Sequence, residues 1–414
     1  MAISWLAPWI TAGLWGVGSV VWAEWVRDSY HALAHVWPTL YRLHVWHHRA
    51  FRPDLSIVDA AVYQRSQWVN DVPECLVMLT LSGALWGSLQ FSGLVHSWGV
   101  WAGSVYTLFF LAGAIARGTG WGWAHDVTDL THLPGRFLAP PSEWRVNRTY
   151  HWRHHFDNQK AYYSGSFSFF DKLWGTALSL KGKTVAITGA SGTLGRSLLK
   201  ELIRQGAKPI ALTSSGSALR IDGTESDTFK TVTWQIGHEE SLDSLWKSVD
   251  ILILNHGINV GSDRSVEALD QSYEVNTFSQ WKLLNSFLKT VETNAEIAQK
   301  EVWVNTSEAE VNPAFSPLYE LSKRTLGDWV SLRRLDSPCV IRKLILGPFR
   351  SALNPVGIMA ADGVSRQIIA LAKRDFRNII VTINPVTYVL FPLREFFVSL
   401  YFKLFTRSSP PSPQ

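Results

Sequence analysis

The sequence predicts a multidomain fold: an all-α integral membrane domain carrying histidine boxes, followed by an α/β domain with a doubly wound (Rossmann) parallel sheet. Three observations indicate this division. The chain has 414 residues, enough for two or three domains. Before residue 180 it concentrates 16 of its 21 tryptophans and 11 of its 13 histidines. After residue 183 short apolar runs alternate with helical ones, which is typical of a parallel sheet flanked by helices. We therefore expect domains at 1–178 and 181–375, with an apolar tail at 376–414.

Three apolar stretches in the first part approach the length of about 20 residues that a spanning helix needs. They are Ile3–Trp22, Leu76–Val95 and Trp98–Ala116. Arginines follow the first and third stretches, so the positive-inside tendency places the histidines, and the active sites they would form, on the cytoplasmic side of the membrane. The alternative is that these are core helices of a soluble domain. The net charge is +5 but the basic residues are scattered, which disfavours a nucleic-acid partner.

The histidines are grouped at helical spacing. His31 and His35 are four residues apart, so a helix places both on one face. His44 pairs in the same way with His47 or His48, and His151 pairs with His154 or His155. Adjacent histidines point about 100° apart on a helix. Either each member of such a pair faces one of two metal ions, or one is a ligand and the other supports it. Imidazole suits Zn, Cu, Fe and Ni. Nearby carboxylates can orient the rings by accepting the second ring N–H, and the candidates are Asp28, Asp126, Asp129 and Asp157.

Three segments resemble the sterol desaturase/fatty acid hydroxylase superfamily: Tyr30–His35, Trp37–Arg49 and His151–His155. The resemblance covers about residues 1–175. It implies two iron ions, oxygen-dependent hydroxylation or desaturation of a lipid, and an external electron donor of the ferredoxin or cytochrome type. The ligands it implies are His31, His35, His44, His47, His48, His151, His154 and His155. The family adds histidines between the middle and last boxes, and His125 and His132 are the candidates here, although their spacing is wider than the family's.

The second part begins with a strand at Lys183–Thr188, a glycine-rich loop, and a helix to about Gln205. Glycines let such a loop turn tightly and approach a pyrophosphate at the helix N-terminus. Further strands are expected at Pro209–Thr213, Thr231–Gln235, Asp250–Leu254, Glu301–Asn305 and Val340–Leu346, with helices near Ser241–Ser248, Ala268–Leu288 and Leu318–Leu332. The candidate cofactor-binding residues are Gly189, Ser191, Gly192, Leu194, Gly195, Ser214, Asn255 and Gly257.

A tyrosine and a lysine carry the expected chemistry. Tyr319 and Lys323 are four residues apart and share a helix face. A lysine cation favours phenolate over phenol, so Tyr319 can exchange a proton with an alcohol or carbonyl while hydride moves to or from nicotinamide. Ser307, at the end of a strand, is placed to orient the carbonyl oxygen, with Thr306 as a substitute. Asn276 is a candidate to hold the lysine and a relay water.

This order of motifs resembles the short-chain dehydrogenase/reductase family over about residues 181–352. The motifs are the loop Thr188–Gly195, the segment Asn255–Ile258, Asn276, Ser307 and the Tyr319/Lys323 pair. The second strand ends at Thr213 with no acidic residue for a ribose 2′-OH. This favours NADP, whose 2′-phosphate can take Ser214, Ser215 or Arg220, and NAD is the alternative.

The tail 378–405 is apolar and aromatic. Pro385 and Pro392 argue against one straight spanning helix, which favours a membrane-surface anchor, with dimerisation as the alternative. The whole resembles bacterial fusions of a sterol desaturase-like and a short-chain dehydrogenase domain. We therefore expect a bifunctional membrane oxidoreductase that couples di-iron oxidation of a sterol-like or fatty acyl lipid to alcohol/carbonyl interconversion. The alternative is a di-iron lipid enzyme, hydroxylating or aldehyde-processing, with a non-catalytic NADP-binding domain.

Overall fold

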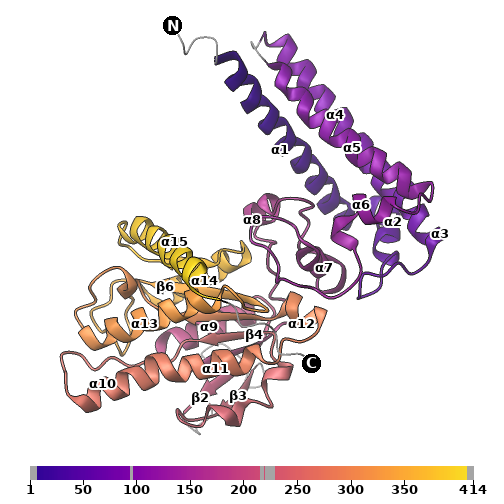
Figure 1. Cartoon of the computed structure of the whole chain (residues 1–414). Helices are drawn as coiled ribbons and strands as arrows, with labels where there is room; N and C mark the ends of the chain where they lie inside the picture. Colours follow the sequence, from indigo (N-terminus) through magenta and orange to yellow (C-terminus); the bar gives the residue numbers. More distant parts are fainter. Residues whose placement is uncertain (1–6, 94–96, 215–218, 220–228, 408–414) are drawn as a thin grey trace. The chain divides into compact units, whose positions relative to one another are not determined.

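The computed structural model describes residues 7–93, 97–214, 219 and 229–407. The chain forms two compact units. Unit 1 contains the residues up to Phe137 and Pro141–Ala177, and unit 2 contains Leu138–Pro140 and the residues from Leu178 onward. Unit 1 is helical and unit 2 holds a parallel sheet between helices (Figure 1). The helical character expected of the first part and the doubly wound sheet expected of the second are confirmed.

Three long helical stretches of unit 1 pack along one another: α1, the run from α3 to α4, and α5 (Figure 1). Glycines allow a close approach at this packing. A Cβ on Gly99 would lie 1.9 Å from the carbonyl oxygen of Ala12, and one on Gly103 would lie 2.5 Å from that of Ser19. The elements are α1 Ala7–Val36, α2 Pro38–Arg49, α3 Ala60–Ser66, the π-helical turn η1 Gln67–Asp71, α4 Val72–Phe91, η2 Ser97–Val100, α5 Trp101–Gly118, α6 Ala124–Thr128, η3 Leu130–His132, α7 Arg148–Phe156 and α8 Phe169–Trp174.

Among the described residues, two helical stretches are long and apolar enough to cross a membrane, on the criterion of length and composition alone: Ala60–Phe91 and Ser97–Gly118. The first begins well before the expected Leu76, and residues 94–96 at the expected end lie outside the described residues. The expected span Ile3–Trp22 lies partly in α1, which continues unbroken to Val36, while residues 1–6 are outside the described part.

Local sequence sets the ends of the shorter helices. The carboxylate of Asp59 accepts hydrogen bonds from the N–H groups of Ala61 and Val62 and so caps α3. The side chain of Asn147 accepts from the N–H of Tyr150 at 2.9 Å and caps α7. The residues of α7 from Thr149 to His155 are all buried although most are polar. A helix this polar is buried only where its side chains find partners, which points to a site rather than to a packing role.

The sheet of unit 2 has seven parallel strands in the order β3-β2-β1-β4-β5-β6-β7. The order reverses between β1 and β4, where doubly wound sheets bind ligands at the carboxyl ends of their strands. All six expected strands are present, and β7 adds a strand within the expected tail. The strands are β1 Thr184–Thr188, β2 Lys208–Thr213, β3 Lys230–Thr233, β4 Ile251–Leu254, β5 Glu301–Asn305, β6 Val340–Leu346 and β7 Asn378–Val381.

Helices cover both faces of this sheet, and apolar residues of β1, β4 and β5 such as Ile187, Ile253 and Trp303 fill the core beneath them. A buried ion group ties β5 to β6: the Arg342 guanidinium lies 2.8 Å from Glu301 and 2.7 Å from Asp375, and all three side chains are fully buried. The helical elements are α9 Thr193–Arg204, η4 Glu239–Leu242, η5 Trp246–Ser248, α10 Val266–Tyr273, the π-helical turn η6 Glu274–Phe278, α11 Ser279–Leu288, α12 Asn294–Gln299, η7 Glu308–Glu310, α13 Pro317–Arg333, α14 Ala361–Lys373 and α15 Thr387–Phe405.

The segment expected to be an apolar membrane-surface anchor contains a strand and a long helix. After β7 the chain forms α15, which packs against α13. Pro385 precedes this helix and Pro392 lies inside it. Because proline has no N–H, Pro392 removes one backbone hydrogen bond from the second turn of α15.

Candidate metal centre and candidate dehydrogenase site

Five histidines of unit 1 direct their ring nitrogens at one point: His31 and His35 of α1, His44 and His48 of α2, and His154 of α7. Their Nε2 atoms form a chain of short contacts. The Nε2 of His154 lies 2.9 Å from that of His31, 3.0 Å from that of His35 and 3.2 Å from that of His48. The Nε2 atoms of His44 and His48 are 3.0 Å apart.

Four further histidines form a second group: His47 of α2, His132 of η3, and His151 and His155 of α7. The Nε2 of His132 lies 2.9 Å from that of His151 and 3.2 Å from that of His155. The Nε2 of His155 lies 3.1 Å from that of His47. In each group the candidate ligand atoms all lie within 4.8 Å of one another.

The two groups lie side by side because neighbouring residues of α2 and α7 are divided between them. His47 and His48 belong to different groups, and so do His154 and His155. The rings of His48 and His155 have centroids 4.6 Å apart, and those of His44 and His47 are 5.4 Å apart. The helical rotation between adjacent residues produces this division, which is one of the two alternatives that the sequence left open. His44 therefore pairs with His48, and His151 pairs with His155.

Three of the rings have a fixed partner for the nitrogen on their outer side. The Nδ1 atoms of His31 and His154 lie 2.7 and 2.8 Å from the carbonyl oxygens of Tyr163 and Ala161. His44 Nδ1 lies 2.8 Å from the side-chain oxygen of Asn70. A ring that donates its Nδ1–H to such an oxygen keeps a free lone pair on Nε2, which is the form that binds a metal.

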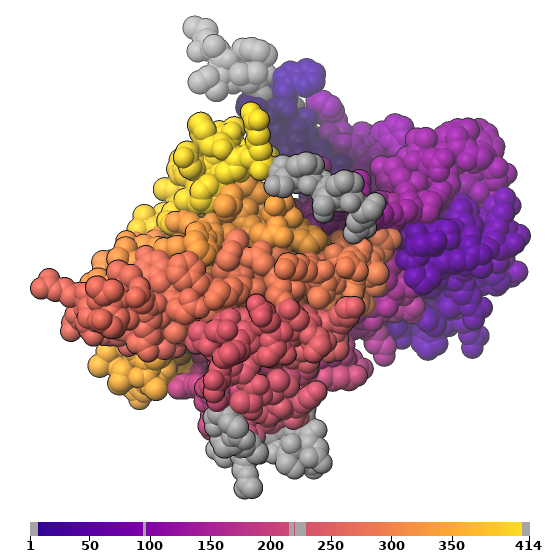
Figure 2. All heavy atoms as spheres, turned by 60° about the horizontal axis from the view of Figure 1, so that its bottom comes forward, coloured from indigo at the N-terminus to yellow at the C-terminus, as the bar shows by residue number. Residues whose placement is uncertain are grey.

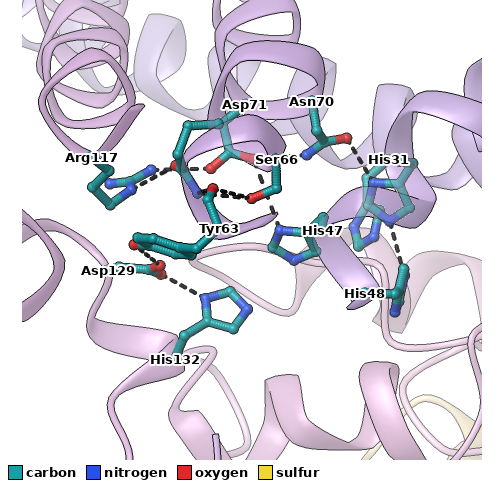
Figure 3. Close-up of polar contacts among 12 residues, drawn as sticks. His31, His47, His48, Tyr63, Ser66, Asn70, Asp71, Arg117, Asp129 and His132 are labelled. Atoms are coloured by element: carbon teal, nitrogen blue, oxygen red, sulfur yellow. Dashed lines mark hydrogen bonds and ion pairs between the residues drawn. The ribbon is translucent and has the colours of Figure 1, made fainter. Parts of the chain in front are cut away.

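His132 has the strongest partner of this kind. Its Nδ1 lies 2.6 Å from a carboxylate oxygen of Asp129, and Tyr63 donates its hydroxyl hydrogen to the other oxygen at 2.9 Å (Figure 3). Beside it, Arg117 donates to Gln67 at 2.7 Å and to Asp71 at 3.1 Å. Asp129 thus orients an imidazole of the second group.

Burial favours the neutral form of most of these rings. It lowers the pKa of His35 to about 3 and that of His44 to about 4. For six further rings burial, together with repulsion from neighbouring imidazoles, lowers the pKa well below its usual value; they are His31, His47, His48, His151, His154 and His155. Neutral rings whose lone pairs converge repel one another unless a cation lies between them. The donor set therefore fits two metal ions, each held by imidazole nitrogens.

The structure does not bring His125 into either group. Its Nδ1 lies 3.2 Å from Asp126, and its ring stands edge-on to Tyr63. His125 lies in α6 and His132 ends η3, and the chain changes direction between these two elements. Only His132 therefore reaches the second group. Two of the other candidate carboxylates serve loops instead: Asp28 accepts from the N–H of Gly165, and Asp157 from the hydroxyl of Tyr162.

Sequence reasoning missed Asn70 and the carbonyl groups of Tyr163 and Ala161. Asn70 carried a signal, because a polar residue at the start of an apolar helical stretch is costly without a partner. The two carbonyl groups carried none, since any residue type supplies one.

In unit 2 the glycine loop forms a narrow cradle between β1 and α9. Gly189 has φ +61°, and a Cβ there would lie 2.9 Å from the Cα of His256. A Cβ on Gly195 would lie 2.3 Å from the carbonyl oxygen of Gly189. Gly192 starts α9 without a side-chain cap, so the first N–H groups of that helix are free to face a phosphate. These features fit a dinucleotide, and Leu194 is buried beneath them while Ser191 is exposed.

Around the cradle, Asn255 extends its amide to the carbonyl oxygen of Gly189 at 3.5 Å and accepts a hydrogen bond from Asn305 at 3.1 Å. Ser214 is exposed at the end of β2, where no acidic residue stands. Ser215 and Arg220, the other candidates for a 2′-phosphate, lie outside the described residues.

The candidate catalytic residues gather at the ends of β4 and β5. A hydrogen bond joins the side chains of Ser307 and Tyr319. Lys323 donates to the carbonyl oxygen of Asn305 at 2.9 Å. Gly257 lies beside Asn276 and Lys323. A Cβ on this glycine would be 3.0 Å from Asn276 Oδ1 and 3.8 Å from Lys323 Nζ. Thr306 is buried and its N–H bonds to β6, so Ser307 is the hydroxyl that faces the tyrosine.

Burial affects the charge of the tyrosine and the lysine. It raises the pKa of Tyr319, which the hydrogen bond from Ser307 only partly offsets, and it lowers the pKa of Lys323 to about 7 against the opposing effect of Glu310. Asn276 uses its amide on the backbone N–H and carbonyl of Ile258, at 2.9 and 3.0 Å, and so fixes the loop below the site.

Comparison with known proteins agrees with this description. Residues 183–332 match the short chain dehydrogenase family. Unit 2 is thus a short-chain dehydrogenase domain, and it follows a histidine-rich helical region. Over 417 aligned residues the chain is 58% identical to a monoglucosyldiacylglycerol epimerase of Synechocystis sp., an alignment that covers 99% of this chain and 100% of that protein. The chain belongs to the family of that epimerase.

Two more distant relatives match only part of the chain. The short chain dehydrogenase macD of Penicillium terrestre is 30% identical over 142 residues, which cover 29% of this chain and 43% of that protein. A crystal structure of a short chain dehydrogenase from Burkholderia cenocepacia J2315 in complex with NADP covers 56% of this chain and 100% of its own, with 19% identity and a TM-score of 0.45.

Proposed function

We propose that this chain is a membrane-associated epimerase that inverts one ring carbinol in the sugar headgroup of monoglucosyldiacylglycerol. The proposal rests on one observation: the 58% identity to the named epimerase extends over the whole length of both chains, so both units are matched. The dehydrogenase domain gives this activity a chemical route, because an alcohol carbon can be inverted by oxidation to a ketone and reduction from the opposite face.

The cradle of Gly189, Gly195 and the start of α9 would hold the nicotinamide dinucleotide, which supplies hydride acceptance and return when it is bound. NADP is favoured because the residue that follows β2 is Ser214 rather than a carboxylate, and NAD is the alternative. The first and second hydride transfers cancel, so the reaction needs the cofactor in catalytic amount and no outside reductant.

Tyr319 and Ser307 would handle the proton and the oxygen. Tyr319 takes the proton from the carbinol hydroxyl as the carbon is oxidised, and returns it when the ketone is reduced. Ser307 holds the same oxygen by a hydrogen bond. Lys323, once its ammonium is charged beside the tyrosine, favours the phenolate. Inversion requires that the sugar ring present its other face between the two transfers.

Unit 1 supports a second candidate activity. Nine convergent imidazoles would hold two ions, and we propose iron, with His31, His35, His44, His48 and His154 at one ion and His47, His132, His151 and His155 at the other. Bound iron supplies oxygen chemistry, which epimerisation does not need because it is redox-neutral. The candidate activity is therefore oxygen-dependent hydroxylation or desaturation of the lipid, with electrons from an external ferredoxin- or cytochrome-type donor.

One experiment tests the first proposal and separates it from the second. Purified full-length protein is incubated with monoglucosyldiacylglycerol and NADP⁺ under nitrogen and then in air, and the sugar and acyl chains are analysed by mass spectrometry and NMR. We expect the wild type to epimerise the sugar without oxygen and Tyr319→Phe to lose this activity. Unchanged epimerisation by Tyr319→Phe would place the reaction outside unit 2 and would favour a non-catalytic nucleotide domain. Acyl oxidation that appears only in air, with an electron donor, would support the second activity.

A further inference from the structure

Helix α15 presents its apolar residues outward. Phe396 and Phe397 are 60% and 58% exposed, and Leu404 and Phe405 are 67% and 72% exposed. Further exposed apolar residues extend this surface toward the start of the helix: Tyr388, Val389, Leu390, Leu393, Leu400 and Tyr401. In Figure 2 the atoms of this segment, in yellow, lie open on the surface of the molecule. We refer to these residues as the outer face of α15.

The inner face of the same helix is charged. Glu395 is buried and lies 2.9 Å from Lys343 of β6 and 3.1 Å from Arg334 of α13. Arg394 lies 2.7 Å from Asp328. A surface helix of a soluble protein buries its apolar stripe and exposes its charges. In α15 this arrangement is reversed, which is expected of a helix whose outer surroundings are apolar.

The charged inner face is also attached to the loop that carries Ser307. Glu310 follows Ser307 by three residues, and it lies 2.8 Å from Lys343 and 3.2 Å from Arg394. Thr387 at the start of α15 donates to Glu308 of the same loop at 3.1 Å. These contacts fix the orientation of α15 on unit 2. They therefore also fix the position of its outer face relative to the loop that carries Ser307.

The breadth of the apolar surface indicates which partner covers it. The stripe that contacts the protein is narrow and follows i, i+4 spacing through Thr387, Phe391 and Glu395. In the last turn, from Leu400 to Phe405, the apolar side chains are exposed on nearly every side. A second copy of the chain would cover one stripe of a helix, whereas a bilayer surrounds all of its free surface.

The charges of the last turns agree with a lipid partner. Over the described residues 396–407 the exposed charged side chains are Lys403 and Arg407, both basic. Aromatic residues together with basic ones and without exposed acids are typical of helices that lie in the interface of a membrane with anionic lipids.

We propose that the outer face of α15 docks unit 2 onto the surface of a lipid bilayer that contains anionic lipids. The helix then lies among the headgroups, and the loop with Ser307, which is ion-paired to it, is held against the membrane. This docking does not depend on the epimerase reaction, since it follows from the reversed faces of the helix.

Spin-label accessibility in nanodiscs tests the proposal on the full-length chain. Both native cysteines are buried and are replaced by alanine, and a nitroxide is attached at Phe397→Cys or, as a water-exposed control, at Glu267→Cys. In nanodiscs with anionic lipid we expect the label at 397 to collide more with oxygen than with a water-soluble nickel chelate, and the label at 267 to show the reverse. Chelate accessibility at 397 equal to that at 267 would overturn the proposal. Dipolar broadening between labels at 397 would overturn it in favour of a second copy.

A variant pair keeps the test independent of labelling at one position. With the nitroxide at Leu404→Cys, F396D/F397D is expected to shift the label from oxygen toward chelate accessibility. The matched control V266D/L269D changes two exposed apolar residues of α10 and is expected to leave the label unchanged. Circular dichroism confirms folding of each variant. Unchanged oxygen accessibility in folded F396D/F397D would contradict bilayer docking.

Discussion

The substitution Asp129→Asn perturbs one of the two histidine groups and leaves the other unchanged. Asp129 lies 2.6 Å from His132 Nδ1, and His132 is one of the four histidines of the second group. The asparagine oxygen can still accept the ring N–H, but the charge that strengthens this bond is lost. Changes to groups that orient a metal-binding histidine weaken metal affinity by about 10–100-fold, and the retained acceptor places this one near about 10-fold, or about 1.4 kcal/mol.

The assay is equilibrium dialysis of the full-length protein against buffered Fe²⁺ under nitrogen, with Zn²⁺ as a redox-inert probe and metal content measured by mass spectrometry. We expect the wild type to bind two ions and Asp129→Asn to bind one with unchanged affinity and one more weakly. Asp126→Asn is the matched control, because Asp126 contacts only His125 among the histidines and His125 lies in neither group. Equal weakening of both ions, or no weakening of either, would refute the assignment of Asp129 to one site.

The other predictions concern unit 2. Gly195→Ala puts a Cβ 2.3 Å from a backbone oxygen of the cradle and should weaken NADP binding at least about 10-fold by calorimetry, whereas Gly363→Ala, with open space around it, should not. Arg342→Met removes the buried guanidinium that lies between Glu301 and Asp375, and it should destabilise β5 and β6 by about 3–5 kcal/mol in native-state hydrogen exchange. The exposed Arg204→Met should leave this exchange nearly unchanged. Competitive acylation of the cofactor-free protein should give Lys323 a pKa of about 7. This pKa of folded Lys323 is below the pKa of the same lysine in the unfolded chain. Between these two pKa values the unfolded chain therefore holds one more proton than the folded protein. The free energy of unfolding rises with pH across this range, from about pH 7 upward.

Each of these has a contradicting result. Equal NADP affinity in the two glycine variants would show that the cradle does not enclose the dinucleotide. Unchanged exchange of β5 and β6 in Arg342→Met would mean that the ion group does not stabilise the sheet. An acylation midpoint of Lys323 near that of an exposed lysine would mean that burial does not control its charge.

Periodic patterns allowed much of the fold to be predicted. The six expected strands of unit 2 follow from short apolar runs, and the division of His47 from His48 follows from the rotation of a helix. The seventh strand, Asn378–Val381, was hidden because an edge strand of four residues next to an apolar helix reads as one apolar segment.

Features that depend on tertiary contacts could not be predicted. His132 belongs to the second histidine group and His125 does not, because the chain leaves α6 after Thr128 and turns into η3 between the two residues. The raised pKa of Tyr319 also depends on burial in the folded protein, which the YxxxK pattern does not contain. The sequence also does not show which face of α15 contacts the protein, and the structure shows that Glu395 is buried there.

The central claim is that unit 2 inverts a sugar carbinol by removing a hydride and returning it to the same carbon. The most direct measurement uses monoglucosyldiacylglycerol with a perdeuterated glucosyl headgroup, purified full-length protein and catalytic NADP⁺ in ordinary water, with the product analysed by NMR and mass spectrometry. We predict an epimerised product that retains deuterium at every ring carbon, including the inverted one. An epimerised product in which the inverted carbon carries hydrogen from the solvent would contradict the claim, because it would mean that the carbon was deprotonated rather than oxidised.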